Sequence, residues 1–182
     1  MRERGFTLVE VLTALGILCA AALSVAQLIA VITRATHVAR LQTSTVALSA
    51  ARMEELRSLE WGYDSAGNPV SDRSTNLASE PLQSNGTGLA FSPPGALDQN
   101  TSGFVDFLDR GGGWLSAGPA PPPGAAYVRR WSIEAPADGA SDTLVIQVLT
   151  RPIAEDVTTS PRRPAVGRGE ARLLSLLTRV AP

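Results

Sequence analysis

The feature that most constrains this chain is an apolar stretch at residues 6–33. As a helix rising about 1.5 Å per residue, the stretch would be about 42 Å long, which exceeds the roughly 30 Å of hydrocarbon in a bilayer. Glu10 carries its only formal charge, and a carboxylate inside hydrocarbon costs about 3 kcal/mol. The stretch therefore predicts a membrane-spanning helix with one carboxylate that needs a partner.

A short basic leader, residues 1–5, precedes this stretch and contains Arg2 and Arg4. Positive charge beside a membrane span indicates that this end stays in the cytoplasm and that the rest of the chain lies outside. Two other interpretations stay open. A secretory signal peptide has a shorter apolar core, but the small residues at 20–22 and 24–26 could be accepted by a signal peptidase. The third interpretation is an uncleaved anchor.

The residues Gly-Phe-Thr-Leu-Val-Glu at 5–10 follow the basic leader and open the apolar stretch. This motif resembles the processing site of the type IV pilin and type II secretion pseudopilin superfamily. In that superfamily a membrane-embedded prepilin peptidase cuts after the glycine and methylates the new amino terminus. The resemblance implies cleavage between Gly5 and Phe6, and N-methylation of Phe6.

Glu10 gains a physical role if this cleavage takes place. The cut creates a positive α-amino group on Phe6, and the Phe6 of a neighbouring subunit beside Glu10 would form a charge-assisted pair in a low dielectric. A subunit at the wrong height would leave Glu10 unpaired, so the pair would fix the axial register of packed helices. The alternative is a carboxylate that reaches interfacial water or is protonated.

The helix is expected to continue through residues 34–60, because no glycine or proline interrupts them. Apolar and small residues recur there at helical spacing on one face, namely Val38, Leu41, Thr45, Leu48, Leu56 and Leu59. Arg52 lies within this face, and we expect its stem to cover apolar surface while its charge reaches water. The face predicts an amphipathic half-helix packed on a globular domain.

The composition changes at residues 61–126, which are rich in Gly, Pro, Ser and Asn. Such segments favour turns and extended loops. We expect a variable loop region held to the core by a few apolar anchors, namely Leu89, Phe91, Phe104, Val105, Phe107, Leu108 and Trp114. In pilin-like proteins this region often forms the exposed face, so the resemblance places partner contacts here.

The last part, residues 127–182, contains three segments rich in β-forming residues. Residues 127–134 and 143–150 flank Asp138-Gly139, which predicts an antiparallel hairpin. Residues 170–180 suit either a helix or a strand, and the resemblance favours a strand. The expected fold class is α+β and pilin-like, with a long N-terminal helix packed on a small antiparallel β-sheet head. The order of elements most resembles a minor pilin of the V type.

Several classes of site find no support in the sequence. The 16 basic residues are balanced by 17 acidic ones, which gives no reason to expect a nucleic-acid surface. Cys19 and His37 are the only residues of their types, so no intramolecular disulfide can form and a zinc cluster lacks ligands. A Ser-His-Asp triad would have to use His37, which we expect to be an exposed helix residue instead. Two pairs of acidic residues lie beside turns, Asp106 with Asp109 and Asp138 with Asp142. Each pair is too small to supply the oxygen ligands that a calcium ion needs. We expect no catalytic residue, metal or cofactor.

The resemblance, together with these patterns, implies a minor pilin of a type IV pilus, with a type II secretion minor pseudopilin as the alternative. A membrane-anchored or secreted binding or hydrolytic domain is the alternative from another class. The resemblance implies as partners other pilin or pseudopilin subunits, the prepilin peptidase and an inner-membrane assembly platform. The resemblance also implies that the protein is located in the bacterial inner membrane, with its N-terminus in the cytoplasm and its head in the periplasm. From there the protein would be incorporated into a pilus or pseudopilus.

Overall fold

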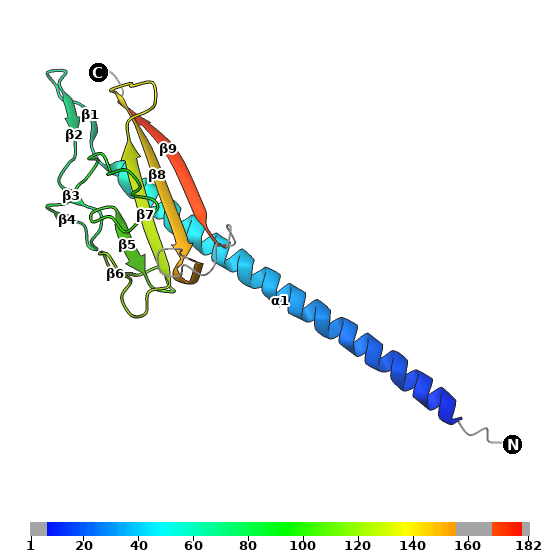
Figure 1. Ribbon diagram of the computed structural model, residues 1–182. Coiled ribbons are helices and arrows are strands. Elements are labelled where there is room, and N and C mark those ends of the chain that lie inside the picture. Colours follow the sequence, from blue (N-terminus) through cyan, green and yellow to red (C-terminus); the bar gives the residue numbers. More distant parts are fainter. Residues whose placement is uncertain (1–6, 156–168, 180–182) are drawn as a thin grey trace. The chain divides into compact units, whose positions relative to one another are not determined.

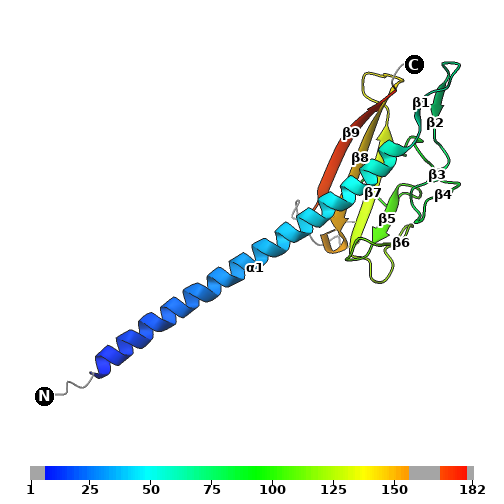
Figure 2. The same cartoon turned by 180° about the vertical axis from the view of Figure 1, so that it is seen from behind.

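The computed structural model describes residues 7–155 and 169–179 (Figures 1 and 2). The chain divides into two compact units, residues 1–40 and residues 41–182, and we call the second unit the head. A single helix, α1 (Leu8–Ser58), contributes to both units. The predicted long N-terminal helix is confirmed, and its end lies two residues before the predicted boundary at Glu60, within the usual variation of helix termini.

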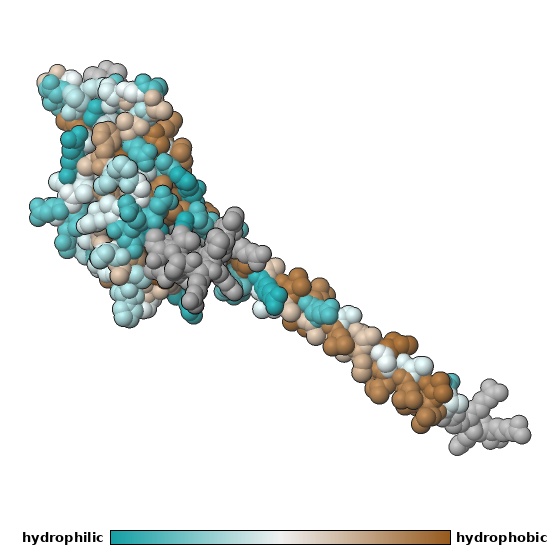
Figure 3. All heavy atoms as spheres, viewed as in Figure 1, coloured by the Kyte–Doolittle hydropathy of each residue, from teal (hydrophilic) through white to brown (hydrophobic). Residues whose placement is uncertain are grey.

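In the first unit, α1 presents apolar side chains on all sides, and they appear brown in Figure 3. This helix is long and apolar enough to cross a membrane. The hydroxyls of Thr13, Ser24 and Thr33 donate hydrogen bonds to backbone carbonyls four residues earlier, at 2.9, 2.9 and 2.8 Å. Polar groups that bond within their own helix suit a segment without access to water.

A five-stranded antiparallel sheet forms the centre of the head, with strand order β6-β5-β7-β8-β9. Its strands are β5 (Val105–Leu108), β6 (Trp114–Ser116), β7 (Tyr127–Glu134), β8 (Thr143–Pro152) and β9 (Ala171–Thr178). The predicted hairpin is confirmed as β7 and β8, with Trp131 opposite Val148. The third predicted strand is confirmed as β9, which pairs with β8.

Two small sheets and a short 3-10 helix complete the described part of the head. One small sheet pairs β1 (Trp61–Tyr63) with β2 (Pro69–Ser71), and the other pairs β3 (Thr75–Asn76) with β4 (Gln83–Ser84). The 3-10 helix, η1 (Ile153–Glu155), follows β8 directly.

The last turns of α1 lie across one face of the five-stranded sheet, as the opposite views in Figures 1 and 2 show. The helix buries Thr45, Ser49, Arg52, Met53 and Leu56, which follow one another at three- or four-residue spacing apart from the adjacent pair at 52 and 53. Its apolar side chains join a core that includes Leu77, Leu89, Phe104, Trp131, Ile133, Leu144, Ile146 and Val148. Burial of this face fixes the helix to the sheet.

The segment predicted as a loop region, residues 61–126, contains six short strands that the prediction lacked, and its other residues form turns and loops. All four residues of β5 are buried between β6 and β7. A strand with both faces covered shows no alternation of polar and apolar residues, and four residues are too few to reveal it. Among the predicted anchors, Phe104 and Leu89 are buried, whereas Phe91 is 59% exposed.

Arg52 does not reach water as predicted, because its side chain is buried at the helix–sheet interface. Its Nη2 lies 2.6 Å from Oδ2 of Asp106 on β5, and that same oxygen lies 2.6 Å from Nη2 of Arg129 on β7. The Arg52 guanidinium also lies 4.7 Å from the ring centre of Trp131. Asp106 supplies the partner that makes burial of an arginine possible at this position.

Candidate functional site

The amino-terminal end of α1 holds the one predicted site residue that the structure places, Glu10. Thr7 precedes the helix, and its backbone N–H and its hydroxyl each donate to Oε2 of Glu10 at 2.9 Å. The N–H of Glu10 donates in return to the Thr7 hydroxyl at 3.3 Å. This reciprocal pattern is a capping box, which satisfies free N–H groups at a helix start. The negative charge of the Glu10 carboxylate also interacts favourably with the positive end of the helix dipole.

Sequence analysis identified Glu10 but missed Thr7 as its partner. The spacing Thr-x-x-Glu directly before an apolar helix is a known capping signal and was visible in the sequence. The Glu10 carboxylate therefore already has a partner within its own chain. Oε1 of Glu10 makes no hydrogen bond to any residue in 7–155 or 169–179, so one carboxylate oxygen is left for another donor. The other predicted site residues, Gly5 and Phe6, lie outside the described residues.

The sequence around this helix start is similar to a known protein family. The model of the prokaryotic N-terminal methylation motif matches residues 1–26. The chain carries the prepilin-type cleavage motif of pilin and pseudopilin proteins. No curated protein and no solved structure matches the chain significantly.

This motif supports a type IV pilin-like or pseudopilin-like protein, as the sequence predicted. It implies processing by a prepilin peptidase and assembly with other pilin subunits, and it suggests a structural rather than an enzymatic protein. The apolar first part of α1 fits membrane anchoring of such a subunit. The match covers the helix start and the apolar stretch as far as residue 26, and it does not extend to the head.

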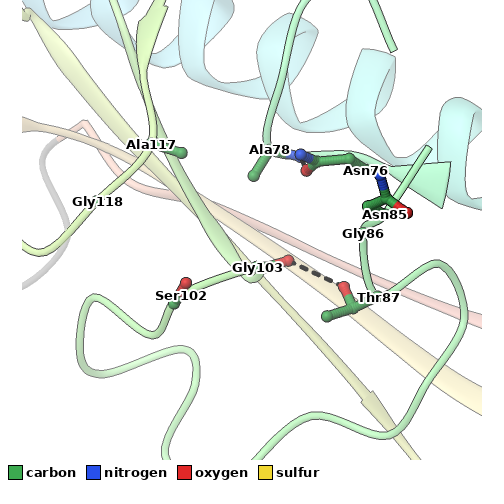
Figure 4. Close-up of a pocket in the computed structure, with 9 residues that line it drawn as sticks. All are labelled: Asn76, Ala78, Asn85, Gly86, Thr87, Ser102, Gly103, Ala117 and Gly118. Carbon is green, nitrogen blue, oxygen red and sulfur yellow. Dashed lines mark hydrogen bonds between the residues drawn. The ribbon is translucent and has the colours of Figure 1, made fainter. Parts of the chain in front are cut away.

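The head contains a hollow of about 290 Å³ between the β3–β4 segment and the segments that flank β5 and β6 (Figure 4). Small, uncharged residues line it, among them Asn76, Asn85, Thr87 and Ser102. The Thr87 hydroxyl donates to the carbonyl of Gly103 at 3.3 Å. Because no titratable side chain lines the hollow, its walls offer neither an acid–base pair nor a charged metal ligand.

The carboxylates considered for calcium are used within the fold. Asp106 is bonded to two arginines, and Asp109 accepts the N–H groups of Gly111 and Gly113 at 2.7 and 2.9 Å. Asp138 accepts the N–H of Ala140 at 3.1 Å. Within the described ranges, no group of three or more His, Cys, Asp or Glu side chains is placed to hold a metal ion.

Proposed function

We propose that this chain is a minor pilin, a structural subunit of a type IV pilus. The observation that supports the proposal most strongly is the methylation motif at residues 1–26, which coincides with the apolar first part of α1. A prepilin peptidase would cut between Gly5 and Phe6 and methylate the new amino group of Phe6. The subunit would then be held in the inner membrane through residues 6–33 until it is assembled.

Glu10 would gain a second partner during assembly. Before assembly, Thr7 gives its carboxylate two neutral hydrogen bonds. In the filament, the amino group of a neighbouring Phe6 would add a charged donor at the free oxygen Oε1, and charge-assisted hydrogen bonds are about twice as strong as neutral ones. This pair does not require the capping box to break, because a carboxylate accepts about four hydrogen bonds.

Determination of the mature amino terminus tests the proposal directly. The chain would be produced in a host that has a prepilin peptidase, and its start would be read by N-terminal sequencing and intact mass. We expect the protein to begin at Phe6 and to carry one added methyl group. A start at Met1, or after Ala22 or Ala26, would contradict it and would favour an anchor or a signal peptide.

A pair of glycine variants controls for effects on folding. Gly5→Trp should block processing, because the peptidase of this superfamily requires a glycine before the cut. Gly16→Val changes a glycine that has no neighbouring atoms within 4 Å of an added Cβ, so processing should continue. Equal processing of both variants would argue against cleavage after Gly5.

The alternative of a type II secretion minor pseudopilin rests on the same motif, since both systems use it. Loss-of-function strains separate the two systems. Deletion of the gene for a minor pilin should reduce surface pili and leave protein secretion intact. The opposite outcome would assign the chain to a secretion pseudopilus, and neighbouring genes for either system would point the same way.

A further inference from the structure

Two arginines and the single histidine of the chain follow the apolar stretch on α1, namely Arg34, Arg40 and His37. All three residues are exposed. Their three-residue spacing places them within about 120° of the helix circumference, so they lie on one side of the helix. We call these three residues the basic face.

No carboxylate of α1 lies close enough to neutralise the basic face. The chain has no acidic residue between Glu10 and Glu54. Along the helix, Glu10 lies about 36 Å from Arg34, and Glu54 lies about 21 Å from Arg40. Both distances exceed the Debye length of about 8 Å at physiological salt. Neither guanidinium makes an ion pair or hydrogen bond to residues 7–155 or 169–179, so both charges are available to a partner.

The position of the basic face along α1 matches the thickness of a membrane. Measured from the helix start at Leu8, Arg34 lies about 39 Å and Arg40 about 48 Å along the axis. A bilayer with its headgroups is about 40 to 45 Å thick. If the helix start lies at one membrane surface, the two arginines therefore bracket the headgroup layer at the other surface. Side chains of a helix tilt toward its N-terminus, so the Arg40 side chain leans back toward this layer.

The headgroup layer offers phosphate as an anionic partner. Arginine binds phosphate through parallel charge-assisted hydrogen bonds, and one basic residue near an anionic membrane surface strengthens binding about fivefold. His37 lies between the two arginines, and its ring N–H is a further donor. An acidic protein surface would also attract the arginines, but their position along the helix and the tilt of their side chains favour a lipid.

We propose that the basic face binds the phosphate groups of anionic phospholipids in the outer leaflet of the membrane that stores the subunit. This inference rests on the proposed function, because it takes α1 to be anchored in a membrane before assembly. Incorporation into a filament would have to break these contacts, so anionic lipid would help to retain unassembled subunits.

Native mass spectrometry of the full chain in a nonionic detergent tests this proposal. The chain is titrated with phosphatidylglycerol and, separately, with phosphatidylcholine, which has a phosphate but no net charge. We expect phosphatidylglycerol to bind at least about tenfold more tightly at low salt, and the difference to shrink as salt rises. Inorganic phosphate and poly-glutamate serve as competitors, and each should displace the lipid only in large excess.

Variants locate the contact. Arg34→Gln and Arg40→Gln should each weaken phosphatidylglycerol binding about fivefold and leave phosphatidylcholine binding unchanged. Arg34→Lys keeps the charge and should bind phosphatidylglycerol more tightly than Arg34→Gln. Arg57→Gln is the matched control, because Arg57 is an exposed arginine of the same helix about 26 Å beyond Arg40. All these positions are exposed, so the variants should fold as the parent does.

Three outcomes would overturn the proposal. They are equal binding of the two lipids by the parent chain, equal weakening by Arg57→Gln and Arg34→Gln, and displacement of the lipid by an equimolar amount of either competitor. The test is separate from that of the proposed function. A mature start at Phe6 without a lipid preference would reject only the role of the basic face, whereas a start at Met1 with a lipid preference would reject only the pilin.

Discussion

Asp106 accepts charge-assisted hydrogen bonds from arginines on two different elements, Arg52 on α1 and Arg129 on β7. Burial lowers the pKa of Arg52, and the nearby charge of Arg129 lowers it further, while Asp106 and Glu55 act in the opposite direction. The two guanidinium groups also donate to the carbonyls of Leu77 and Leu48. One fully buried carboxylate thus permits two cations to be buried between helix and sheet.

Replacement of this carboxylate should be among the most destabilising single changes in the head. Asp106→Asn keeps the shape but leaves Arg129 without its counter-charge and Arg52 with only Glu55, which lies 2.8 Å from its Nη1, so we expect a loss of about 3 to 5 kcal/mol in the free energy of unfolding. Urea unfolding of the full chain in detergent would measure it. Glu54→Gln removes a carboxylate from an exposed pair with Arg57 at 3.4 Å and should cost less than about 1 kcal/mol. Similar losses for the two variants would contradict this account.

Asp72 holds the turn between β2 and β3 and should make it acid-sensitive. Its carboxylate accepts the hydroxyl of Thr75 at 2.6 Å and the N–H of Ser74 at 2.8 Å. These bonds, the Thr75 hydroxyl foremost, lower the pKa of Asp72 below its ordinary value of 3.8. The folded state therefore binds this proton more weakly than the unfolded state, so the stabilisation is present above pH 3.8 and is lost as the pH falls below it.

The Asp72→Asn variant tests this dependence. We expect it to be less stable than the parent chain at neutral pH and to lose less stability between pH 4 and the acid limit. Urea midpoints measured across this pH range would show the two curves converging at low pH. Parallel curves would mean that Asp72 makes no contribution to the pH dependence.

The elements that the sequence predicted are those with a visible period or a long uninterrupted pattern. The helix and the β7–β8 hairpin were predicted because apolar spacing and the Asp138-Gly139 turn identify them, whereas β9 was predicted as a strand only from the resemblance, since its leucines suit a helix equally well. The strand β5 was missed, since it is short and has an aspartate in its buried run. The partners of Arg52 could not be predicted, because Asp106 and Arg129 are distant in sequence and only the fold brings them together.

β9 lies at one end of the sheet order, and no described strand pairs with its outer edge. The N–H of Arg179 donates to the carbonyl of Asp142 at 2.8 Å. By the alternation of an antiparallel ladder, the backbone groups that face the free edge belong to Arg172, Leu174, Leu176 and Thr178. Leu174 and Leu176 are 64% and 60% exposed. An edge of this kind favours pairing with another strand.

A charge on this edge should therefore reduce self-association without unfolding the head. Leu176→Lys replaces an exposed side chain, so stability should change by no more than about 0.5 kcal/mol. Sedimentation of the full chain in detergent at increasing concentration should show less association than in the parent. Leu82→Lys, at an exposed leucine outside the five-stranded sheet, should leave association unchanged. Equal behaviour of the two variants would remove β9 as the cause.

The whole chain combines a processing motif, an apolar helix and a head whose core does not depend on the motif. The sequence was sufficient to identify the motif and Glu10, since those residues are contiguous. The capping signal Thr-x-x-Glu was also visible in the sequence but was missed, and the structure shows that Thr7 already bonds to Glu10. Glu10 thus has two roles to separate, the cap of its own helix and the proposed pair with a neighbouring Phe6. Only the second requires a negative charge.

Substitutions at two positions separate these roles. Glu10→Gln preserves the capping box, since glutamine also occupies this position, but it removes the charge. Thr7→Ala removes the capping hydroxyl and keeps the charge, at a cost of about 1 kcal/mol in helix stability. If the intersubunit pair governs assembly, Glu10→Gln and Glu10→Val should both remain in the membrane and be incorporated more than about tenfold less, while Thr7→Ala is incorporated nearly as well as the parent. Immunoblots of sheared pili against the membrane fraction would measure the ratio. Normal incorporation of Glu10→Gln would assign Glu10 to the cap alone.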